Sequence, residues 1–407
     1  MNSEINKAFY PELGLVKTDT FSSVYPLINE YMMTNRQLEE SRDGEARELL
    51  DFKTQLTNPY RRCVGGYRRD INVFFLLAEA MWIATGRKDV KFLTIFNKQM
   101  AEYSDDGKVF HAPYGYRLRH WGIASENEFV DSAVENKGLD QVTNAIRILS
   151  NNPSTRQVVM EIWNPSFDLG HVTKDLPCND IVMLKIRNGK MITTIGNRSN
   201  DLHWGLPTNI FQFSFLTELM AASIGVELGT QTHNSQSLHI YSWNKIADTM
   251  LNELKKYREG GEERENELYF TTGARERHID FNFSNSIAVN RFVEIEYHLN
   301  AIIDNLLRLN VGESECEFDI KRLEQFSKYL YSVYQMLKVY IVYKNMLPKC
   351  MNGSEKDYLR RQCADKMRMI HETFVGLESA WDIALLAENF FWTRLSTKET
   401  DGPLGTL

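Results

Sequence analysis

Apolar residues recur at helical spacing in two clear segments of the first 285 residues. Residues 71–85 form one such segment, and Gly86 is placed to end the predicted helix. Residues 211–224 form the other, closed by Gly225. The first helix carries Glu79 among apolar neighbours, so we expect a carboxyl group in a buried setting.

Other segments show the patterns of strands. Residues 49–56 fit a strand, and residues 156–163 alternate in polarity and are rich in branched side chains. The runs 181–186 and 191–195 flank Asn188-Gly189, a pair that favours the positive φ angles of a tight hairpin turn. Up to about residue 60 the pattern is otherwise irregular.

Beyond about residue 285 the pattern is helical throughout. We therefore expect an α+β domain over residues 1–285, with a large mixed sheet covered by helices, and an all-helical C-terminal extension over residues 286–407. Aromatic residues of the extension are interpreted as packing, although a tail that covers a functional site is the alternative. Two apolar helix faces carry this prediction: Phe292, Ile295, Leu299, Ile302 and Leu306, and Leu323, Phe326, Leu330, Val333 and Leu337.

Composition excludes several classes of protein. The chain has 407 residues, of which 43% are apolar, so a large core needs no disulfide or metal. Its five cysteines lack a CxxC pair and the spacing of a zinc site, so we expect reduced thiols and no metal. The net charge of −7 argues against binding a nucleic-acid polymer and leaves room for a small anion. We find no signal sequence and no membrane-spanning run, and expect a soluble, cytoplasmic protein.

Four short motifs follow one another in the order of a known family. They are Pro177-Cys178-Asn179, Arg198-Ser199-Asn200-Asp201, Gly205-Leu206-Pro207-Thr208-Asn209-Ile210 and His239-Ile240-Tyr241. At these residues the chain resembles the thymidylate synthase and deoxynucleotide hydroxymethylase family, and most of all its phage-type branch. The resemblance covers roughly residues 40 to 245, and includes Glu79 to Trp82, Pro113-Tyr114-Gly115 and Ser154-Thr155-Arg156.

The resemblance implies a reaction that begins at one cysteine. C5 of uracil becomes nucleophilic only after a group adds to C6, and Cys178 would be that group. Arg198 would favour the thiolate form of the cysteine. Glu79, working through ordered water, would move protons at O4 and C5, with help from Tyr114. Asp201 would hold the site and the ring.

The same resemblance implies the substrate contacts of a pyrimidine deoxynucleoside monophosphate. Asn209 would bind the N3 and O4 edge of the base, beside Asn179, and His239 and Tyr241 would bind the 3′-hydroxyl. An obligate homodimer follows, in which two sheets pack back to back and one phosphate ligand comes from the partner subunit. The phosphate ligands would be Arg198, Ser199, Arg42 and the partner's Arg156.

The one-carbon donor implied by the resemblance is 5,10-methylenetetrahydrofolate, with no metal. Its binding residues would be Trp82, Met100, Asp201 and Gly205. Met100 stands where the family usually has a stacking tryptophan, Asn179 where it has histidine, and Gln157 where it has a second interface arginine. A helical tail replaces the short C-terminal segment that usually closes over the substrate.

Reductive methylation of dUMP to dTMP is the leading hypothesis. Asn209 favours uracil, because hydroxymethylases that select cytosine usually have an acid there. The first alternative is hydroxymethylation of dUMP or dCMP, in which water captures the methylene group on C5. The second is a catalytically silent homologue that binds nucleotide and regulates or scaffolds. Taken singly, Cys178 and His239 would fit buried structural residues, and Asn209 would fit a helix N-cap.

Overall fold

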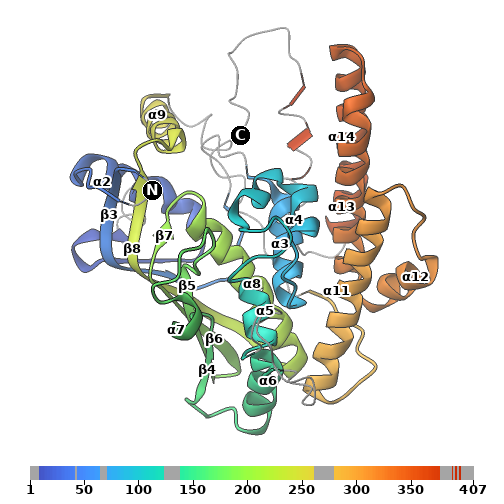
Figure 1. Ribbon diagram of the computed structural model, residues 1–407, viewed down its shortest axis with the longest axis horizontal. Helices are drawn as coiled ribbons and strands as arrows, with labels where there is room; N and C mark the ends of the chain where they lie inside the picture. The colour runs from blue at the N-terminus through green and yellow to red at the C-terminus, as the bar shows by residue number, and fades with distance from the viewer. Residues whose placement is uncertain are drawn as a thin grey trace.

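One mixed sheet forms the centre of the fold (Figure 1). The computed structural model describes residues 9–41, 44–64, 71–122, 138–260 and 279–375, together with residues 387, 390, 391, 394 and 395. The sheet order is β1-β2-β3-β8-β6-β5-β4, and β7 pairs with β8. The strands are β1 (Phe9–Tyr10), β2 (Leu15–Thr18), β3 (Ala46–Leu56), β4 (Val158–Glu161), β5 (Asn179–Arg187), β6 (Lys190–Asn197), β7 (Asn200–Asp201) and β8 (Glu227–Tyr241).

The sheet is mixed because β2 runs parallel to β3, and β8 runs parallel to β6 and β7. The predicted hairpin is confirmed as β5 and β6. Asn188 and Gly189 adopt φ angles of 52° and 72°, as a tight turn between right-twisted strands requires. The α+β prediction is therefore confirmed.

Helices cover one face of the sheet (Figure 1). The α-helices are α2 (Tyr25–Asn35), α3 (Val73–Ala84), α4 (Val90–Phe96), α5 (Tyr114–Arg119), α6 (Gln141–Asn151), α7 (Pro165–Asp168), α8 (Gly205–Ile224), α9 (Lys245–Gly260), α11 (Ala288–Asn310), α12 (Glu317–Phe326), α13 (Lys328–Met346) and α14 (Gly353–Val375). Short 3₁₀ helices are η1 (Pro11–Leu13), η2 (Phe21–Ser23), η3 (Lys98–Tyr103) and η5 (Leu347–Lys349).

The central helix is α8, whose residues are almost all buried. It begins at Gly205, six residues before the predicted start, so the expectation that Asn209 caps this helix is wrong. Pro207 concealed the true start, yet proline is tolerated in a first helical turn because the N–H it lacks has no partner there. Gly225 ends the helix as predicted, with φ at 89°. Asn209 consequently lies in the second turn.

The C-terminal helices pack into the same core as the sheet domain. Phe292 on α11 and Tyr340 on α13 belong to one hydrophobic cluster with residues of α3 and α8. The ring of Tyr340 stacks on Phe74 of α3 at 4.5 Å between centroids. The helical character of this region is confirmed for the described residues, and Tyr329, Tyr340 and Tyr343 are buried in the packing role expected of such aromatic residues. The boundary at residue 285 stays a prediction.

On the other face of the sheet, β4, β5 and β6 leave apolar side chains partly exposed. Val159 is 48% exposed, and its partner across the ladder is Met183. Ile181 and Ile192 share this face and are half-buried. These residues are named the open sheet face below.

Candidate active site

Cys178 lies directly before β5, at an end of the sheet. Its side chain is half-buried, so the sulfur is neither locked in the core nor fully in solvent. The Cys178 backbone N–H donates to the Tyr114 hydroxyl at 3.3 Å. Tyr114 is the first residue of α5, so this bond joins the cysteine to the helical layer.

Arg198 is brought to Cys178 by the hairpin register. Asn179 pairs with Asn197, which places the residues before β5 and after β6 together. The guanidinium donates from Nε to the Pro177 carbonyl at 2.8 Å, and Nη2 lies 3.9 Å from the Cys178 sulfur. These contacts place the guanidinium group beside the thiol.

Glu79 projects from α3 and is near enough to Tyr114 to contribute to raising the pKa of its hydroxyl. Burial raises the pKa of Glu79 to about 8, although a hydrogen bond with Gln212 of α8 opposes the shift. Its Oε2 atom is buried and has no hydrogen-bond partner among the described residues. A carboxyl group that titrates near neutral pH suits proton transfer.

The pKa of Tyr114 is raised well above its usual range, first by burial and then by Cys178 and Asp175. The Tyr114 hydroxyl is therefore a neutral group at physiological pH. It can donate or accept a hydrogen bond without changing the charge of the site.

Asn179 and Asn209 are in direct contact. Asn179 Nδ2 donates to Asn209 Oδ1 at 3.0 Å, and Asn209 Nδ2 donates to Asn200 Oδ1 at 3.1 Å. All three residues are buried. The amide predicted to read the base therefore belongs to a larger polar group.

The short strand β7 joins two of the predicted motifs. Asp201 pairs with His239 in the register of β7 and β8. Asp201 Oδ1 accepts the backbone N–H groups of His203 and Trp204, which precede α8. The rings of His239 and Tyr241 lie 4.8 Å apart. The Arg-Ser-x-Asp and His-x-Tyr motifs thus lie side by side.

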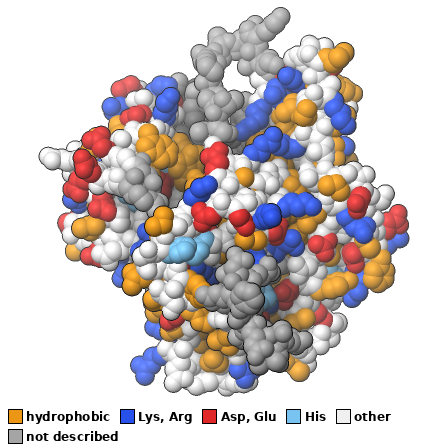
Figure 2. Space-filling model, in the orientation of Figure 1, with side chains coloured by type: hydrophobic (Ala, Val, Ile, Leu, Met, Phe, Trp, Pro, Cys, Tyr) orange, Lys and Arg blue, Asp and Glu red, His pale blue; other side chains and the backbone are white. Residues whose placement is uncertain are grey.

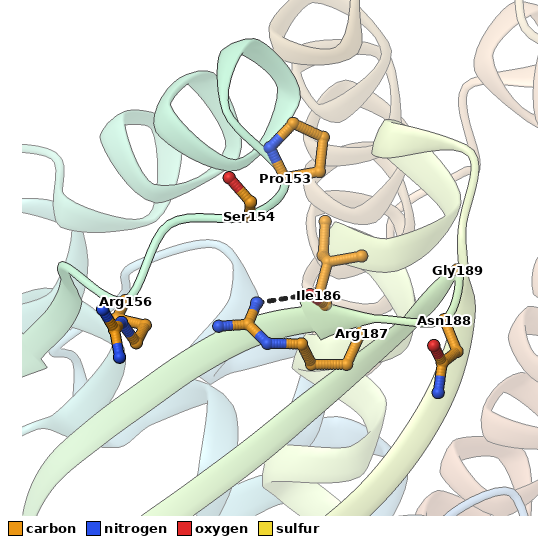
Figure 3. A pocket seen from close by; sticks show the side chains of 7 residues that line it. All are labelled: Pro153, Ser154, Arg156, Ile186, Arg187, Asn188 and Gly189. Atoms are coloured by element: carbon orange, nitrogen blue, oxygen red, sulfur yellow. Dashed lines mark hydrogen bonds between the residues drawn. The ribbon is translucent and has the colours of Figure 1, made fainter.

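Arg156 does not lie with these residues. Together with Arg187 it lines a hollow of about 480 Å³ beside the turn of the β5–β6 hairpin (Figure 3). Cys178 lies at the opposite end of β5, and the eight steps along the strand from Cys178 to Ile186 span about 26 Å at roughly 3.3 Å per residue. Arg156 therefore cannot reach the Cys178 site of its own chain. Arg42 lies outside the described residues.

The residues predicted to bind folate fall into two groups. Gly205 begins α8 close to Asp201. Trp82 is buried, and its indole N–H donates to the Asp89 carbonyl at 3.0 Å. Met100, on η3, packs against the main hydrophobic cluster.

Ser199, a predicted phosphate ligand, follows Arg198 in the connection to β7 and is half-buried.

Sequence reasoning assigned no role to Asp180 or to Trp163, although Trp163-Asn164 follows Ser154-Thr155-Arg156 in the family resemblance. Burial raises the pKa of Asp180 to about 6, while Arg198 lowers it. The Arg198 guanidinium lies 5.7 Å from the centre of the Trp163 ring. Asp180 follows the Pro-Cys-Asn motif directly, and Trp163 ends the predicted strand. The sequence signal that could have identified Asp180 is its position directly after the Pro-Cys-Asn motif.

The segment that leads to Cys178 is hydrogen-bonded to the loop before α5. Asp175 accepts the backbone N–H of Ala112 at 2.8 Å. Asp105 accepts the Thr173 hydroxyl and the Lys174 backbone N–H. These bonds hold the cysteine-bearing segment against Tyr114.

Charged side chains of both signs are spread over the face shown in Figure 2. A second hollow of about 470 Å³, between α4 and η3, is lined by Lys91, Lys98 and Lys108 and contains no predicted site residue. Among the described residues, no group of three or more His, Cys, Asp or Glu side chains could hold a metal ion. None of the helices in the described ranges is both long and apolar enough to cross a membrane.

Comparison with known proteins gives the same family as the motifs. A family model described as thymidylate synthase matches residues 39–337. A deoxyuridylate hydroxymethyltransferase of Bacillus phage SP01 is 43% identical over 202 residues, which are 49% of this chain and 51% of the phage protein. Another, of Pseudomonas phage M6, is 37% identical over 51% of this chain and 57% of the phage protein.

Thymidylate synthase 1/2 of Encephalitozoon cuniculi is 35% identical over 31% of this chain and 42% of that protein. The chain thus spans about half the length of the curated relatives that it matches. The family match covers well over half of the chain and includes Cys178, Arg198, Asn209 and His239. The chain belongs to the thymidylate synthase family.

Proposed function

We propose that this protein transfers a one-carbon unit to C5 of dUMP through a covalent adduct between Cys178 and C6 of the base. The observation that carries the proposal is the half-buried Cys178 sulfur with Arg198 directed at it, beside the buried amide of Asn209. A nucleophile, a cation and a base-reading amide are thereby gathered at one end of the sheet.

Cys178 starts the reaction. A guanidinium near the sulfur favours the thiolate, which adds to C6 and moves the electron pair of the C5–C6 bond towards O4. C5 then becomes the nucleophile. The hydrogen bonds that the Arg198 guanidinium donates to the Pro177 and Leu176 carbonyls hold the cation in place during this step.

Glu79 and Tyr114 move the protons. Once C5 carries the new carbon, its proton must leave, and a carboxyl group with a pKa of about 8 accepts and returns protons readily near neutral pH. The transfer runs through water between the carboxylate and the base. The neutral Tyr114 hydroxyl orients that water.

Asn209, His239 and Tyr241 select the substrate. The amide meets the N3 and O4 edge of uracil, and the His239 and Tyr241 side chains meet the 3′-hydroxyl. Arg198 and Ser199 bind the phosphate from the same subunit.

The one-carbon unit comes from 5,10-methylenetetrahydrofolate. Asp201 and Gly205, at the start of α8 beside the amide cluster, fit a folate that lies against the base. Trp82 does not fit a direct ring contact, because its indole is buried and bonded to the main chain. Met100 offers an apolar side chain in place of an aromatic face.

We further propose that water completes the reaction and that 5-hydroxymethyl-dUMP is the product. Two phage relatives that are 43% and 37% identical are named deoxyuridylate hydroxymethyltransferases, which supports this outcome. With Met100 in place of the usual tryptophan, folate would also be held less firmly for hydride transfer. Methylation to dTMP remains the second candidate, supported by the relative named thymidylate synthase.

Product analysis distinguishes the two outcomes. The protein is incubated with dUMP and methylenetetrahydrofolate, and the molecular mass of the nucleotide product is measured by mass spectrometry. Hydroxymethylation leaves one more oxygen atom on the product and yields tetrahydrofolate, whereas methylation yields dihydrofolate, which absorbance detects. A stable adduct with 5-fluoro-dUMP, absent in Cys178→Ala, is expected for both. Binding of the nucleotide without an adduct would instead support the silent homologue.

The proposed enzyme is a homodimer that pairs through the open sheet face. The apolar surface for such contact comes from Val159, Ile181, Met183 and Ile192. Arg156 lies too far from Cys178 of its own chain to bind the phosphate of a nucleotide in that site. Pairing two sheets would allow each Arg156 to reach the partner's phosphate site.

Mixed dimers test this arrangement. Cys178→Ala and Arg156→Ala, each inactive or weak alone, are co-expressed with different tags and the heterodimer is isolated. Because one of its two sites would contain both intact residues, we expect activity to return to about half of the wild-type value. A heterodimer no more active than its parents would show that Arg156 acts within its own chain or not at all.

A further inference from the structure

Four buried asparagine side chains form a continuous chain of hydrogen bonds that ends at a serine. Asn197 Nδ2 donates to Asn179 Oδ1, and Asn179 Nδ2 donates to Asn209 Oδ1 at 3.0 Å. Asn209 Nδ2 donates to Asn200 Oδ1, and Asn200 Nδ2 to Ser235 Oγ, both at 3.1 Å. All the amides therefore point in the same direction along the chain.

The direction of this chain of hydrogen bonds is set at the start of α8. A Cβ built on Gly205, the first residue of the helix, would lie 2.8 Å from Asn200 Oδ1. That oxygen thus lies against the first helical turn, where free N–H groups and the helix dipole favour an acceptor over a donor. Asn200 must then accept from Asn209, and Asn209 must accept from Asn179.

The two ends of the hydrogen-bond chain, Ser235 and Asn197, would tolerate either direction of donation. The Ser235 hydroxyl can donate or accept. At the other end, Asn197 Oδ1 has no hydrogen-bond partner among the described residues, so reversing the chain would exchange one unpaired group for another. The contact of Asn200 with α8 is therefore the feature that determines the direction of the hydrogen bonds.

The orientation of Asn209 determines which base it can read. Each amide oxygen accepts two hydrogen bonds and each NH₂ group donates two, so Asn209 keeps one acceptor and one donor for a ligand. Uracil offers a donor at N3 and an acceptor at O4, and cytosine offers the reverse pair. One orientation of the amide matches one base only.

We propose that Asn179 and Asn200 are positioning residues that fix the amide of Asn209 in the orientation that accepts dUMP and rejects dCMP. The inference rests on the proposed function and adds the origin of its base selectivity. Neither Asn179 nor Asn200 needs to touch the nucleotide for this role.

Two matched substitutions test the proposal. In Asn179→Asp the new carboxylate only accepts, so Asn209 must turn its NH₂ group toward it. Asn200 then turns as well and accepts from the Ser235 hydroxyl. In Asn200→Asp the new carboxylate accepts from Asn209 as the native oxygen does. The same chemical change therefore reverses Asn209 at one position and preserves it at the other.

The measurement is the ratio of kcat/KM for dUMP to that for dCMP, at about pH 8.5 so that an introduced carboxyl group is ionised. We expect Asn179→Asp to shift the ratio by roughly 100-fold toward dCMP, because two mismatched hydrogen bonds are repaired for one base and created for the other. Asn200→Asp should keep the wild-type ratio. Equal ratios in both variants would overturn the proposal.

A third variant covers the case in which Asn179→Asp does not fold. Asn179→Leu removes the donor to Asn209 without adding charge. Only the bond to Asn200 then orients the amide of Asn209, so the ratio should fall part of the way toward one. An unchanged ratio in Asn179→Leu would also overturn the proposal. Wild-type protein inactive on both nucleotides would instead refute the proposed function, which keeps the two failures distinct.

Discussion

Replacing Glu79 by glutamine tests the unusual titration of this carboxyl group. Burial raises its pKa from the ordinary 4.5 to about 8 in the folded protein. Each pH unit between these values corresponds to about 1.4 kcal/mol, so ionising Glu79 in the folded state costs about 5 kcal/mol. The unfolded chain bears no such cost.

The sign follows from proton binding. Between about pH 4.5 and pH 8 the folded protein holds a proton on Glu79 that the unfolded chain has lost, so the contribution to stability is complete below this range and declines as the pH rises through it. Glu79→Gln is neutral at every pH. The variant and the wild type should be about equally stable near pH 5, and the variant should be more stable by up to about 5 kcal/mol near pH 9.

Urea denaturation at several pH values measures this difference. Glu324→Gln is the matched control, because Glu324 is exposed on α12, and its effect should not change with pH. A difference between Glu79→Gln and wild type that stays constant from about pH 5 to pH 9 would refute the raised pKa. The proposed role in proton transfer would lose its physical basis with it.

Three further predictions concern packing and reactivity. Gly115→Ala should lower the free energy of unfolding by about 2–4 kcal/mol in urea denaturation, because its Cβ would overlap the main chain of α3. Arg62→Met leaves the carboxylate of Glu218 buried without its ion pair and should cost about 3–5 kcal/mol by the same measurement, an effect that a solvent-exposed pair would not give. Arg198→Gln should slow alkylation of Cys178 by iodoacetamide about tenfold near pH 7, followed by mass spectrometry of the peptide; an unchanged rate would show that the guanidinium does not activate the thiol.

Periodicity predicted elements wherever one face of the element packs on apolar neighbours. The buried helix α3, the hairpin β5–β6 and the C-terminal helices all follow this rule. The long strand β8 escaped prediction because its buried positions include Gln231, His233 and Ser235. A strand that lines a polar interior lacks the alternation that marks an ordinary strand.

The N-terminal region escaped prediction for another reason. The helix α2 has a weakly separated polar face, and the strands β1 and β2 are only a few residues long. The strand β2 is stabilised by pairing with β3, and β1 by pairing with β2, which a local pattern does not record.

The site was predicted from motif order more than from local chemistry. The motifs named Cys178, Arg198, Asn209 and His239, and the register of the sheet brings their segments together. The continuous amide chain was not predicted, because Asn197 and Ser235 come from different strands that only the parallel pairing of β6 and β8 aligns. Partner distances across a sheet cannot be derived from spacing along the sequence.

The stacking of Tyr340 on Phe74 has a consequence for how a newly made chain folds. During translation α3 emerges from the ribosome long before α13 does. Until α13 arrives, the ring of Phe74 lacks this stacking partner, and that side of α3 stays exposed to water. The core around α3 is therefore completed late in synthesis, when the C-terminal helices dock on it.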